Sequence, residues 1–358
     1  MRILQIIPNL GSGGAEHFVS ELSIEFVKRN LTCDILTLSS LDNDNSIAKP
    51  SDSRVHLFSL NKPSGFSFKT LWTICSFIRN HDYDIVLGHI GAIKYLTLAT
   101  LICPNTKFFA TIHSDAVFEA GKSFEKWSRK FMFKLNLCTP ITISQESLRS
   151  FELYYNRSAA MIYNGVSSYT SLRNPIVLKD SDDDIIFFHP ASCQPVKNQE
   201  LLFKAFTKLA GEYSNVHLYW AGSNGVHKEL FNSLSCFFSS QITYLGVVPN
   251  VRDYLSVSDA MCLCSKLEGM PITIIEAFST SCIPLCTPVG GCVNMIESGK
   301  NGYLSEDLTV DAYYNMLKNF VELKKEKRTA MREQAFASFS KFDIVTCADK
   351  YLELFKKK

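Results

Sequence analysis

The sequence predicts an α/β protein made of two tandem doubly wound, Rossmann-like domains, each with a parallel sheet. Short apolar runs of strand length alternate with amphipathic runs of helix length, which is typical of such sheets. The alternation stops after Gly165, at a segment rich in Ser, Asn, Pro and Asp, and then restarts. The length of 358 residues also suits two domains. We expect domains at 1–165 and 166–342, with a last helix, 343–358, that packs back on the first domain.

The first half shows uninterrupted apolar runs where strands are predicted. After the first of these runs, Phe18, Val19, Leu22 and Phe26 fall on one face of a helix. The elements expected in this half are strands at 2–8, 32–40, 55–60, 83–89, 107–113, 139–145 and 160–165, and helices at 11–30 and 68–81.

The second half repeats the same pattern. From Val310 on the chain is predicted to be helical, and Asp343 suits the N-cap of the last helix, whose apolar stripe includes Tyr351 and Phe355. The other elements expected in this half are strands at 185–190, 216–222, 242–248, 260–265, 282–287 and 302–305, and helices at 198–213, 227–238, 251–257 and 271–280.

Composition and charge exclude several classes of protein. With 46% hydrophobic and 20% charged residues, the chain is not disordered, and a net charge of +2 does not suit a general nucleic-acid binder. The 12 cysteines are scattered without a C-x-x-C pair, which favours buried, reduced thiols over a zinc site. The chain opens on a strand-like run, and apolar runs such as 95–103 are too short to span a membrane. We expect a cytoplasmic protein.

A glycine-rich loop, Gly11–Glu16, lies between the first strand and the first helix. In doubly wound sheets ligands bind beyond the carboxyl ends of the strands, and a helix N-terminus attracts phosphate. A dinucleotide fingerprint would need glycine where Glu16 stands, and an acid after the second strand, which ends at Ser40. The loop is therefore predicted to contact a phosphate of a ligand other than NAD. The alternative is a tight turn that needs glycine only for its conformation.

The string LEGMPITIIEAF places two glutamates, Glu268 and Glu276, around the start of a helix. Pro271 suits the first helical position, so Glu268 precedes the helix and Glu276 lies within it. Together they offer carboxylates for sugar hydroxyls, and the helix N-terminus offers N–H donors for a phosphate. The alternative is that the carboxylates only compensate the helix dipole.

This string resembles the E-x7-E motif of the retaining family 4 glycosyltransferases, most closely those of bacterial capsule and O-antigen synthesis. The resemblance implies the glycosyltransferase-B fold, in which two Rossmann-like domains face a central cleft. It extends in order along nearly the whole chain, and more closely in the second half. The further matching segments are GGAE, TIHS at 111–114, ITISQ at 141–145, YNGV at 163–166, PVKNQELLFKAF at 195–206, YWAGSN at 219–224, TPVGG at 287–291 and NGYL at 301–304.

The resemblance implies roles for individual residues. Lys197 matches the lysine that neutralises the donor diphosphate, Glu276 the glutamate that holds the ribose, and Glu268 the glutamate near the donor sugar. His113 matches a histidine close to the reacting sugar, although by itself it would also suit a satisfied core histidine. The other donor contacts that we expect are the diphosphate loop Gly13 and Gly14, the base-flanking Val247 and Val248, and the helix-start residues Gly269, Met270, Pro271 and Ile272.

One position departs from the family pattern. An arginine usually stands five residues ahead of the lysine, and here that residue is Ser192. The second cation on the diphosphate is therefore missing from its usual place. Arg252, Lys266 or Lys300 could substitute for it, and a weak or inactive enzyme stays open as an alternative.

Neither a metal nor a cofactor is expected. The D-x-D pattern of other nucleotide-sugar enzymes occurs at 42–44, at 82–84 and within 180–184. These acids lie in a polar loop, before a strand and in the linker, so we interpret them as structural or solvent-exposed. The donor, a UDP- or GDP-sugar, is a substrate.

The stretch 122–134 combines five cations with one glutamate and interleaved aromatic residues. It would form either an ordinary helix with a buried stripe or a surface for anionic membrane lipids. A first half with more basic than acidic residues favours peripheral binding to the inner face of the cell membrane.

We therefore expect a metal-independent, retaining hexosyl- or N-acetylhexosaminyl-transferase. It would move a sugar from a nucleotide diphosphate to a saccharide acceptor, which we expect to be lipid-linked, during O-antigen or capsule synthesis. Nucleic acid is not an expected partner. Two alternatives stay open, a non-catalytic nucleotide-sugar or saccharide-binding protein of the same fold and a nucleotide-sugar epimerase.

Overall fold

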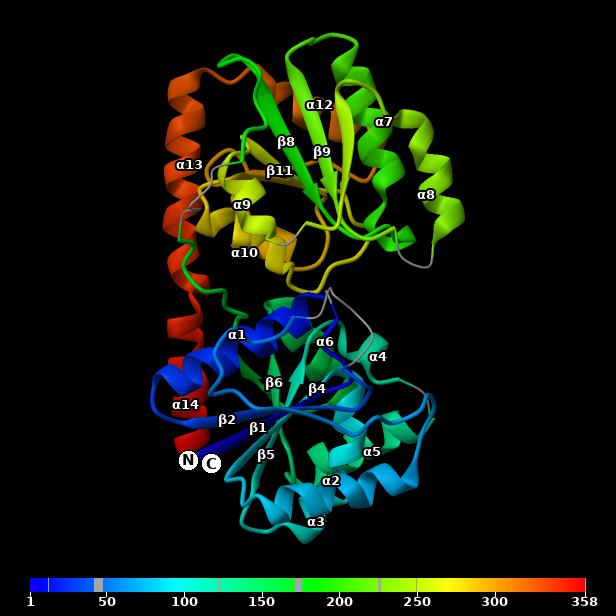
Figure 1. Ribbon diagram of the computed structural model, residues 1–358, viewed down its shortest axis with the longest axis vertical. Helices are drawn as coiled ribbons and strands as arrows, with labels where there is room; N and C mark the ends of the chain where they lie inside the picture. Colours follow the sequence, from blue (N-terminus) through cyan, green and yellow to red (C-terminus); the bar gives the residue numbers. More distant parts are fainter. Residues whose placement is uncertain are drawn as a thin grey trace. The chain divides into compact units, whose positions relative to one another are not determined.

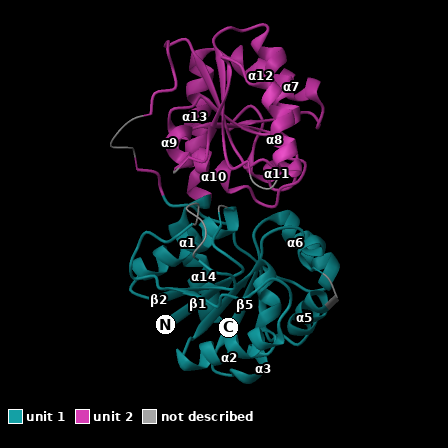
Figure 2. Ribbon diagram, turned by 45° about the vertical axis from the view of Figure 1, so that its right-hand side comes forward, with its two compact units in different colours: residues 1–167, 342–358 teal, residues 168–341 magenta. Residues whose placement is uncertain are grey.

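The computed structural model describes residues 1–11, 13–41, 48–121, 123–170, 176–224, 227–248 and 250–357 (Figure 1). They form two compact units, the first of residues 1–167 with 342–358 and the second of residues 168–341 (Figure 2). Each unit is built on one parallel sheet with helices around it. The boundary lies after Ser167, two residues beyond the composition change at Gly165.

The sheet of the first unit has the strand order β3-β2-β1-β4-β5-β6-β7. Its strands are β1 (Arg2–Ile7), β2 (Thr32–Thr37), β3 (Leu57–Ser59), β4 (Ile85–His89), β5 (Lys107–Ile112), β6 (Thr139–Thr142) and β7 (Ala160–Met161). Strand β1 is central, with Ile3 paired to Cys33 of β2 on one side and to Ile85 of β4 on the other. All strands are parallel, so their carboxyl ends meet at one edge.

The helices of the first unit include the end of the chain. They are α1 (Gly14–Lys28), α2 (Phe68–Asn80), the 3-10 helix η1 (Ile90–Leu96), α3 (Ala99–Ile102), α4 (Ala116–Glu119), α5 (Ser123–Lys134), α6 (Gln145–Tyr155) and α14 (Ile344–Lys357). Helix α14 lies beside α1 (Figure 1), where the rings of Phe26 and Phe355 are 6.1 Å apart and Arg29 pairs with Asp349 at 2.6 Å. As predicted, Asp343 accepts the N–H of Val345 at the start of α14.

The sheet of the second unit has the order β10-β9-β8-β11-β12-β13. Its strands are β8 (Ile185–Pro190), β9 (Val216–Ala221), β10 (Ile242–Gly246), β11 (Ala260–Leu263), β12 (Ile283–Cys286) and β13 (Tyr303–Leu304). Its helices are η2 (Pro195–Lys197), α7 (Gln199–Ala210), α8 (Lys228–Leu234), η3 (Ser235–Phe237), α9 (Val251–Ser256), α10 (Ile272–Ser279), α11 (Cys292–Met295), α12 (Val310–Val321), α13 (Lys325–Phe339) and η4 (Ser340–Phe342).

The core of the second unit centres on β8, all six residues of which are buried. Phe187 packs between Phe206 and Phe320, at ring distances of 5.4 and 5.6 Å. Trp220, also fully buried, donates its Nε1 hydrogen to the carbonyl of Ala191 at 2.7 Å. All 12 cysteines are free thiols, and every one except Cys236 is buried.

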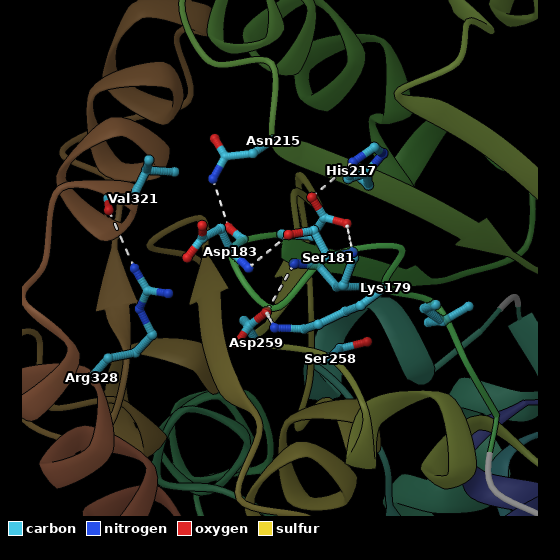
Figure 3. Close-up of polar contacts among 12 residues, drawn as sticks. Lys179, Ser181, Asp183, Asn215, His217, Ser258, Asp259, Val321 and Arg328 are labelled. Carbon is cyan, nitrogen blue, oxygen red and sulfur yellow. Dashed lines mark hydrogen bonds and ion pairs between the residues drawn. The ribbon is translucent and has the colours of Figure 1, made fainter.

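The amino edge of the second sheet is occupied by the acidic end of the linker (Figure 3). The carboxylate of Asp184 accepts the backbone N–H groups of Asp180 and Ser181 and closes the turn before β8. Lys179 pairs with Asp259 at 2.9 Å, and the same carboxylate accepts the N–H of Ile186. Asp184 thus has a structural role, whereas residues 42–44 of the first D-x-D pattern lie outside the described residues.

Within the described ranges, no helix is both long enough and apolar enough to cross a membrane. The longest helices there, α1 and α13, have 15 residues each.

Candidate functional site

Two loops of the second unit bring Lys197 and Glu268 together. Strands β8 and β11 are neighbours, so the chain that leaves each of them emerges at the same edge of the sheet. Lys197 ends η2 after β8, and Glu268 lies between β11 and α10. The Lys197 Nζ is 2.7 Å from the Glu268 Oε1, and the two side chains are 26% and 10% exposed. The pair is therefore partly screened from water but still accessible.

Further hydrogen bonds fix the two loops to each other. The hydroxyl of Ser265 donates to the same Oε1 of Glu268 at 2.6 Å. The backbone N–H of Lys266 donates to the carbonyl of Val196 at 2.8 Å, and the thiol of Cys264 donates to the carbonyl of Lys197 at 3.0 Å. The position of the Lys197 charge is thus set by backbone contacts on both sides.

The glycine pair of TPVGG allows a third loop to approach. Gly290 has a φ of 48°, and a Cβ on it would lie 1.7 Å from the carbonyl oxygen of Glu268. Next to it, the N–H of Gly291 donates to the carbonyl of Gly269 at 2.8 Å. Only glycine satisfies both the conformation and the space at position 290.

Helix α10 places Glu276 at its fifth residue, where the side chain is half-buried. Pro271 is the N-cap rather than the first helical residue, so the prediction was wrong by one position. Met270, Pro271 and Ile272 are buried, and Gly269 is partly exposed. Val247 and Val248 follow β10, and Val247 is 58% exposed.

Two buried acceptors at the same edge have no hydrogen-bond partner, and sequence analysis missed both. His189 in β8 donates from Nδ1 to the carbonyl of Cys262 at 2.8 Å, and its Nε2 is unsatisfied. The amide of Gln199 donates to the carbonyl of Ser192 at 2.9 Å, and its Oε1 is unsatisfied. Burial, with the Lys197 charge, lowers the pKa of His189 to about 4. The signal was a histidine inside the apolar run IIFFHP.

In the first unit the glycine loop leads directly into α1. Gly13 is the N-cap and Gly14 the first residue of the helix. The carboxylate of Glu16 folds back toward Gly13, where a Cβ would lie within 2.4 Å of its Oε2. Burial raises the pKa of Glu16. Glu16 therefore stands beside the loop that was predicted to approach phosphate.

His113 follows β5 and contacts a second histidine. Its Nε2 is 3.0 Å from the Nδ1 of His89, the last residue of β4, and the Nε2 of His89 is 3.0 Å from the Oε1 of Gln5. Burial, and to a smaller extent the nearby charge of Arg129, lowers the pKa of His113 to about 3. His113 is therefore neutral near pH 7. His89 and Gln5 were missed because they lie inside apolar strand runs.

An ion pair beneath His113 corrects one of our predictions. Arg129, expected among exposed cations, is 2% exposed, and its guanidinium contacts Glu119 Oε1 at 3.3 Å. It also donates to the carbonyl of Ile90 at 2.7 Å, and Ile90 has a φ of 51°, unusual for a β-branched residue. The other oxygen of Glu119 accepts the backbone N–H groups of His113 and Ser114 at 2.7 and 3.1 Å.

The rest of the stretch 123–134 is helix α5, with both a buried and an exposed face. Met132 and Phe133 belong to the core, whereas Trp127 is 54% exposed. Lys126 and Lys130 lie over the ring of Tyr154, 5.4 and 5.0 Å from its centroid. Lys122 lies outside the described residues.

Comparison with known proteins identifies the family. The profile of Glycosyltransferase Family 4 matches residues 12–168, and that of Glycosyl transferases group 1 matches residues 173–338. The chain belongs to these glycosyltransferases. The family is generally retaining and metal-independent. In the described part of the chain no three His, Cys, Asp or Glu residues are grouped so that they could hold a metal ion.

Relatives at low identity agree with this assignment. The chain is 27% identical to the N-acetyl-alpha-D-glucosaminyl L-malate synthase of Bacillus anthracis, over 75% of this chain and 74% of that protein. It is 33% identical to the O-antigen biosynthesis glycosyltransferase WbnH of Escherichia coli, over 43% of this chain and 42% of WbnH. The structure of Anabaena HepE in complex with UDP and glucose superposes on this chain with a TM-score of 0.79 and 19% identity, over 100% of each chain. The glycosyltransferase-B fold is thereby confirmed.

Proposed function

We propose that this glycosyltransferase moves a hexosyl or N-acetylhexosaminyl group from a UDP- or GDP-sugar to a lipid-linked saccharide in O-antigen or capsule synthesis. The observation that carries the proposal is the pairing of Lys197 with Glu268 at the carboxyl edge of the second sheet, beside the N-terminus of α10. The O-antigen relative WbnH and the UDP complex of HepE support the substrate classes.

The proposed chemistry is electrostatic. The leaving diphosphate gains negative charge as the glycosidic bond breaks, and Lys197 with the N-terminus of α10 stabilises that charge. Glu276 would hold the ribose and Glu268 would contact the donor sugar. Same-face attack steered by the diphosphate would retain the configuration of the sugar. The base contacts of Val247 and Val248, and the ligand contacts of Gly13, Gly14 and His113, rest on the family resemblance alone.

The ion pair adds a step to this proposal. Lys197 donates one of its three ammonium hydrogens to Glu268, and a diphosphate that draws the ammonium group toward itself weakens this contact. Glu268 retains the hydrogen bond from Ser265 and is released toward the sugar hydroxyls. Binding of the diphosphate would thus free the carboxylate that the sugar needs.

The first experiment is a thermal-shift screen with UDP- and GDP-sugars. A donor at one hundred times its dissociation constant adds about 2.7 kcal/mol to the free energy of unfolding, which such a screen detects readily. The second experiment measures release of nucleotide from the selected donor, with and without a polyprenyl-linked saccharide. Release that depends on the saccharide supports the proposal, and binding without any release indicates the non-catalytic alternative favoured by Ser192.

We also propose that the first unit binds the inner face of the membrane through its basic aromatic surface, defined as Phe66, Phe68, Lys126, Trp127, Lys130 and Lys134. Phe68 is 70% exposed, and the ring of Phe66 lies 4.9 Å from it. Each lysine near an anionic leaflet contributes about 1 kcal/mol, and exposed aromatic rings add interfacial burial. Salt should therefore weaken the binding.

The test of this surface replaces Lys126, Lys130 and Lys134 with serine, and leaves the buried Arg129 in place. Binding to phosphatidylglycerol vesicles should fall while nucleotide-sugar binding is unchanged. The matched control replaces Lys324, Lys325 and Lys327, which are exposed on the second unit, and removes the same charge. If both triple variants lose binding equally, attraction is by net charge, and the surface has no special role.

A further inference from the structure

A buried amide lies in the central strand of the first sheet. Gln5 is fully buried in β1, between aliphatic neighbours. Its Nε2 is 3.0 Å from the carbonyl oxygen of Val19 and 2.6 Å from the hydroxyl of Ser23, both in α1. Its Oε1 faces His89.

The orientation of this amide follows from its partners. The carbonyl of Val19 can only accept a hydrogen bond, so the NH₂ group of Gln5 must face it. The Ser23 hydroxyl donates its own hydrogen to the same carbonyl, at 2.9 Å, and therefore accepts from Gln5. Both amide hydrogens are used, and the oxygen is the atom directed at His89.

The hydrogen-bond partners of His89 also determine which ring nitrogen of His113 carries hydrogen. The Gln5 oxygen only accepts, so the Nε2 of His89 carries hydrogen. His89 is fully buried, which lowers its pKa well below the usual value, and the neutral ring leaves Nδ1 as an acceptor. The Nε2 of His113, 3.0 Å away, must then be the donor.

We propose that Gln5 and His89 are positioning residues that fix His113 as the Nε2–H tautomer and leave its Nδ1 as an acceptor for a sugar hydroxyl. For the described part of the chain, the structure shows no hydrogen-bond partner at this Nδ1, and His113 is only partly buried. The Glu119 carboxylate holds the backbone of His113 in place.

The chain of donors and acceptors selects the ligand group that faces His113. A hydroxyl can donate to Nδ1, whereas a phosphate or carboxylate oxygen would meet a lone pair and be disfavoured. His113 therefore recognises a hydroxyl and does not neutralise the diphosphate. This ligand statement rests on the proposed function, but the tautomer does not.

The tautomer is tested without any substrate. Long-range ¹H–¹⁵N spectra of protein with labelled imidazole rings, assigned with His113→Asn, should show His113 protonated at Nε2 alone at pH 7. In Gln5→Leu the signals should move toward a mixture of tautomers, whereas Thr37→Val, a buried polar change in the neighbouring strand, should leave them unchanged.

Two results of these spectra would contradict the proposal. A proton on Nδ1 of His113 in the unaltered protein, or on both nitrogens, overturns the proposal even if Gln5→Leu fails to fold. An unchanged tautomer in folded Gln5→Leu removes the positioning role of Gln5.

The ligand statement needs a series of donor sugars in which one hydroxyl at a time is replaced by fluorine, which cannot donate. One substitution should weaken binding about 2- to 12-fold in the unaltered protein but not in His113→Ala. Equal losses in both proteins at every position would overturn the ligand statement. Failure of all donors to bind would instead refute the proposed function, while the tautomer result would stand.

Discussion

The carboxyl edges of the two sheets carry polar groups of different kinds. In the first unit a neutral network joins Gln5, His89 and His113, and Gln5 and His89 are themselves strand residues. In the second unit an ion pair between two loops, Lys197 with Glu268, lies beside two neutral buried acceptors. A buried neutral network is stable when each hydrogen bond is made, and it then holds one geometry. A partly exposed ion pair exchanges partners more easily, so the charged side chains of the second edge are better suited to bind a charged ligand.

The largest expected effect is a loss of stability when the buried ion pair of the first unit, Arg129 with Glu119, is broken. Arg129→Met should lower the free energy of unfolding by about 3–5 kcal/mol, because Glu119 is left buried without its partner. Urea denaturation measures the loss. Lys130→Met, a neighbouring exposed lysine, is the control and should cost under 1 kcal/mol. Equal losses in the two variants would contradict a buried ion pair.

The next effect tests the charge of the second edge. Lys197→Ala should lower kcat/KM about 10- to 150-fold, because it removes a charge-assisted contact to the diphosphate. Steady-state release of nucleotide measures this change. Lys204→Ala removes an exposed lysine that pairs with Glu200 and should leave the rate unchanged. Turnover within twofold of normal in Lys197→Ala would place the diphosphate elsewhere.

The buried histidines should make both edges sensitive to acid. The pKa of His113, which faces His89 and Arg129, is about 3, and that of His189, which faces Lys197, is about 4. The unfolded chain takes up these protons near pH 6.5, so the folded state loses stability as pH falls from there toward each folded pKa. Each histidine contributes up to about 1.4 kcal/mol per pH unit.

Unfolding free energies measured between pH 7 and pH 5 check this prediction. His113→Gln and His189→Gln should each flatten the pH dependence, by about 2 kcal/mol over the range. His227→Gln replaces a partly exposed histidine at the start of α8 and is the control. A pH dependence that neither buried substitution changes would assign the acid sensitivity to other groups, such as His89 or the carboxylates.

The fold class and the charged edge were predictable because their signals are local in the sequence. Strand and helix runs alternate visibly, and strings such as EGMP and TPVGG mark loops that need glycine or proline. Helix boundaries were less accurate. The tail from Val310, predicted as helical ahead of a last helix at 343–358, divides at 322–324 into α12 and α13. The last helix, α14, begins and ends within one residue of its predicted bounds.

The neutral edge could not be predicted because its members are distant in the sequence. Gln5, His89 and His113 meet only when β1, β4 and β5 pair in that order. Arg129 was misjudged for a similar reason. A cluster of cations on a helix does not reveal which one faces inward, and its partner Glu119 ends α4, a separate short helix.

The smallest expected effect is a change in UDP affinity when the family's usual arginine is restored at Ser192. The Ser192 side chain accepts a hydrogen bond from Gln194, and its carbonyl accepts from Gln199, whose buried Oε1 lacks a partner. Ser192→Arg would place a guanidinium beside that acceptor, at the edge that holds Lys197. UDP binding, measured by calorimetry, should tighten about 2- to 12-fold and depend more steeply on salt, because a second cation faces the diphosphate. Ser192→Gln adds comparable bulk without charge and should not tighten binding. If both variants bind UDP equally, the loop already meets the diphosphate with other groups, and the missing arginine has no electrostatic consequence.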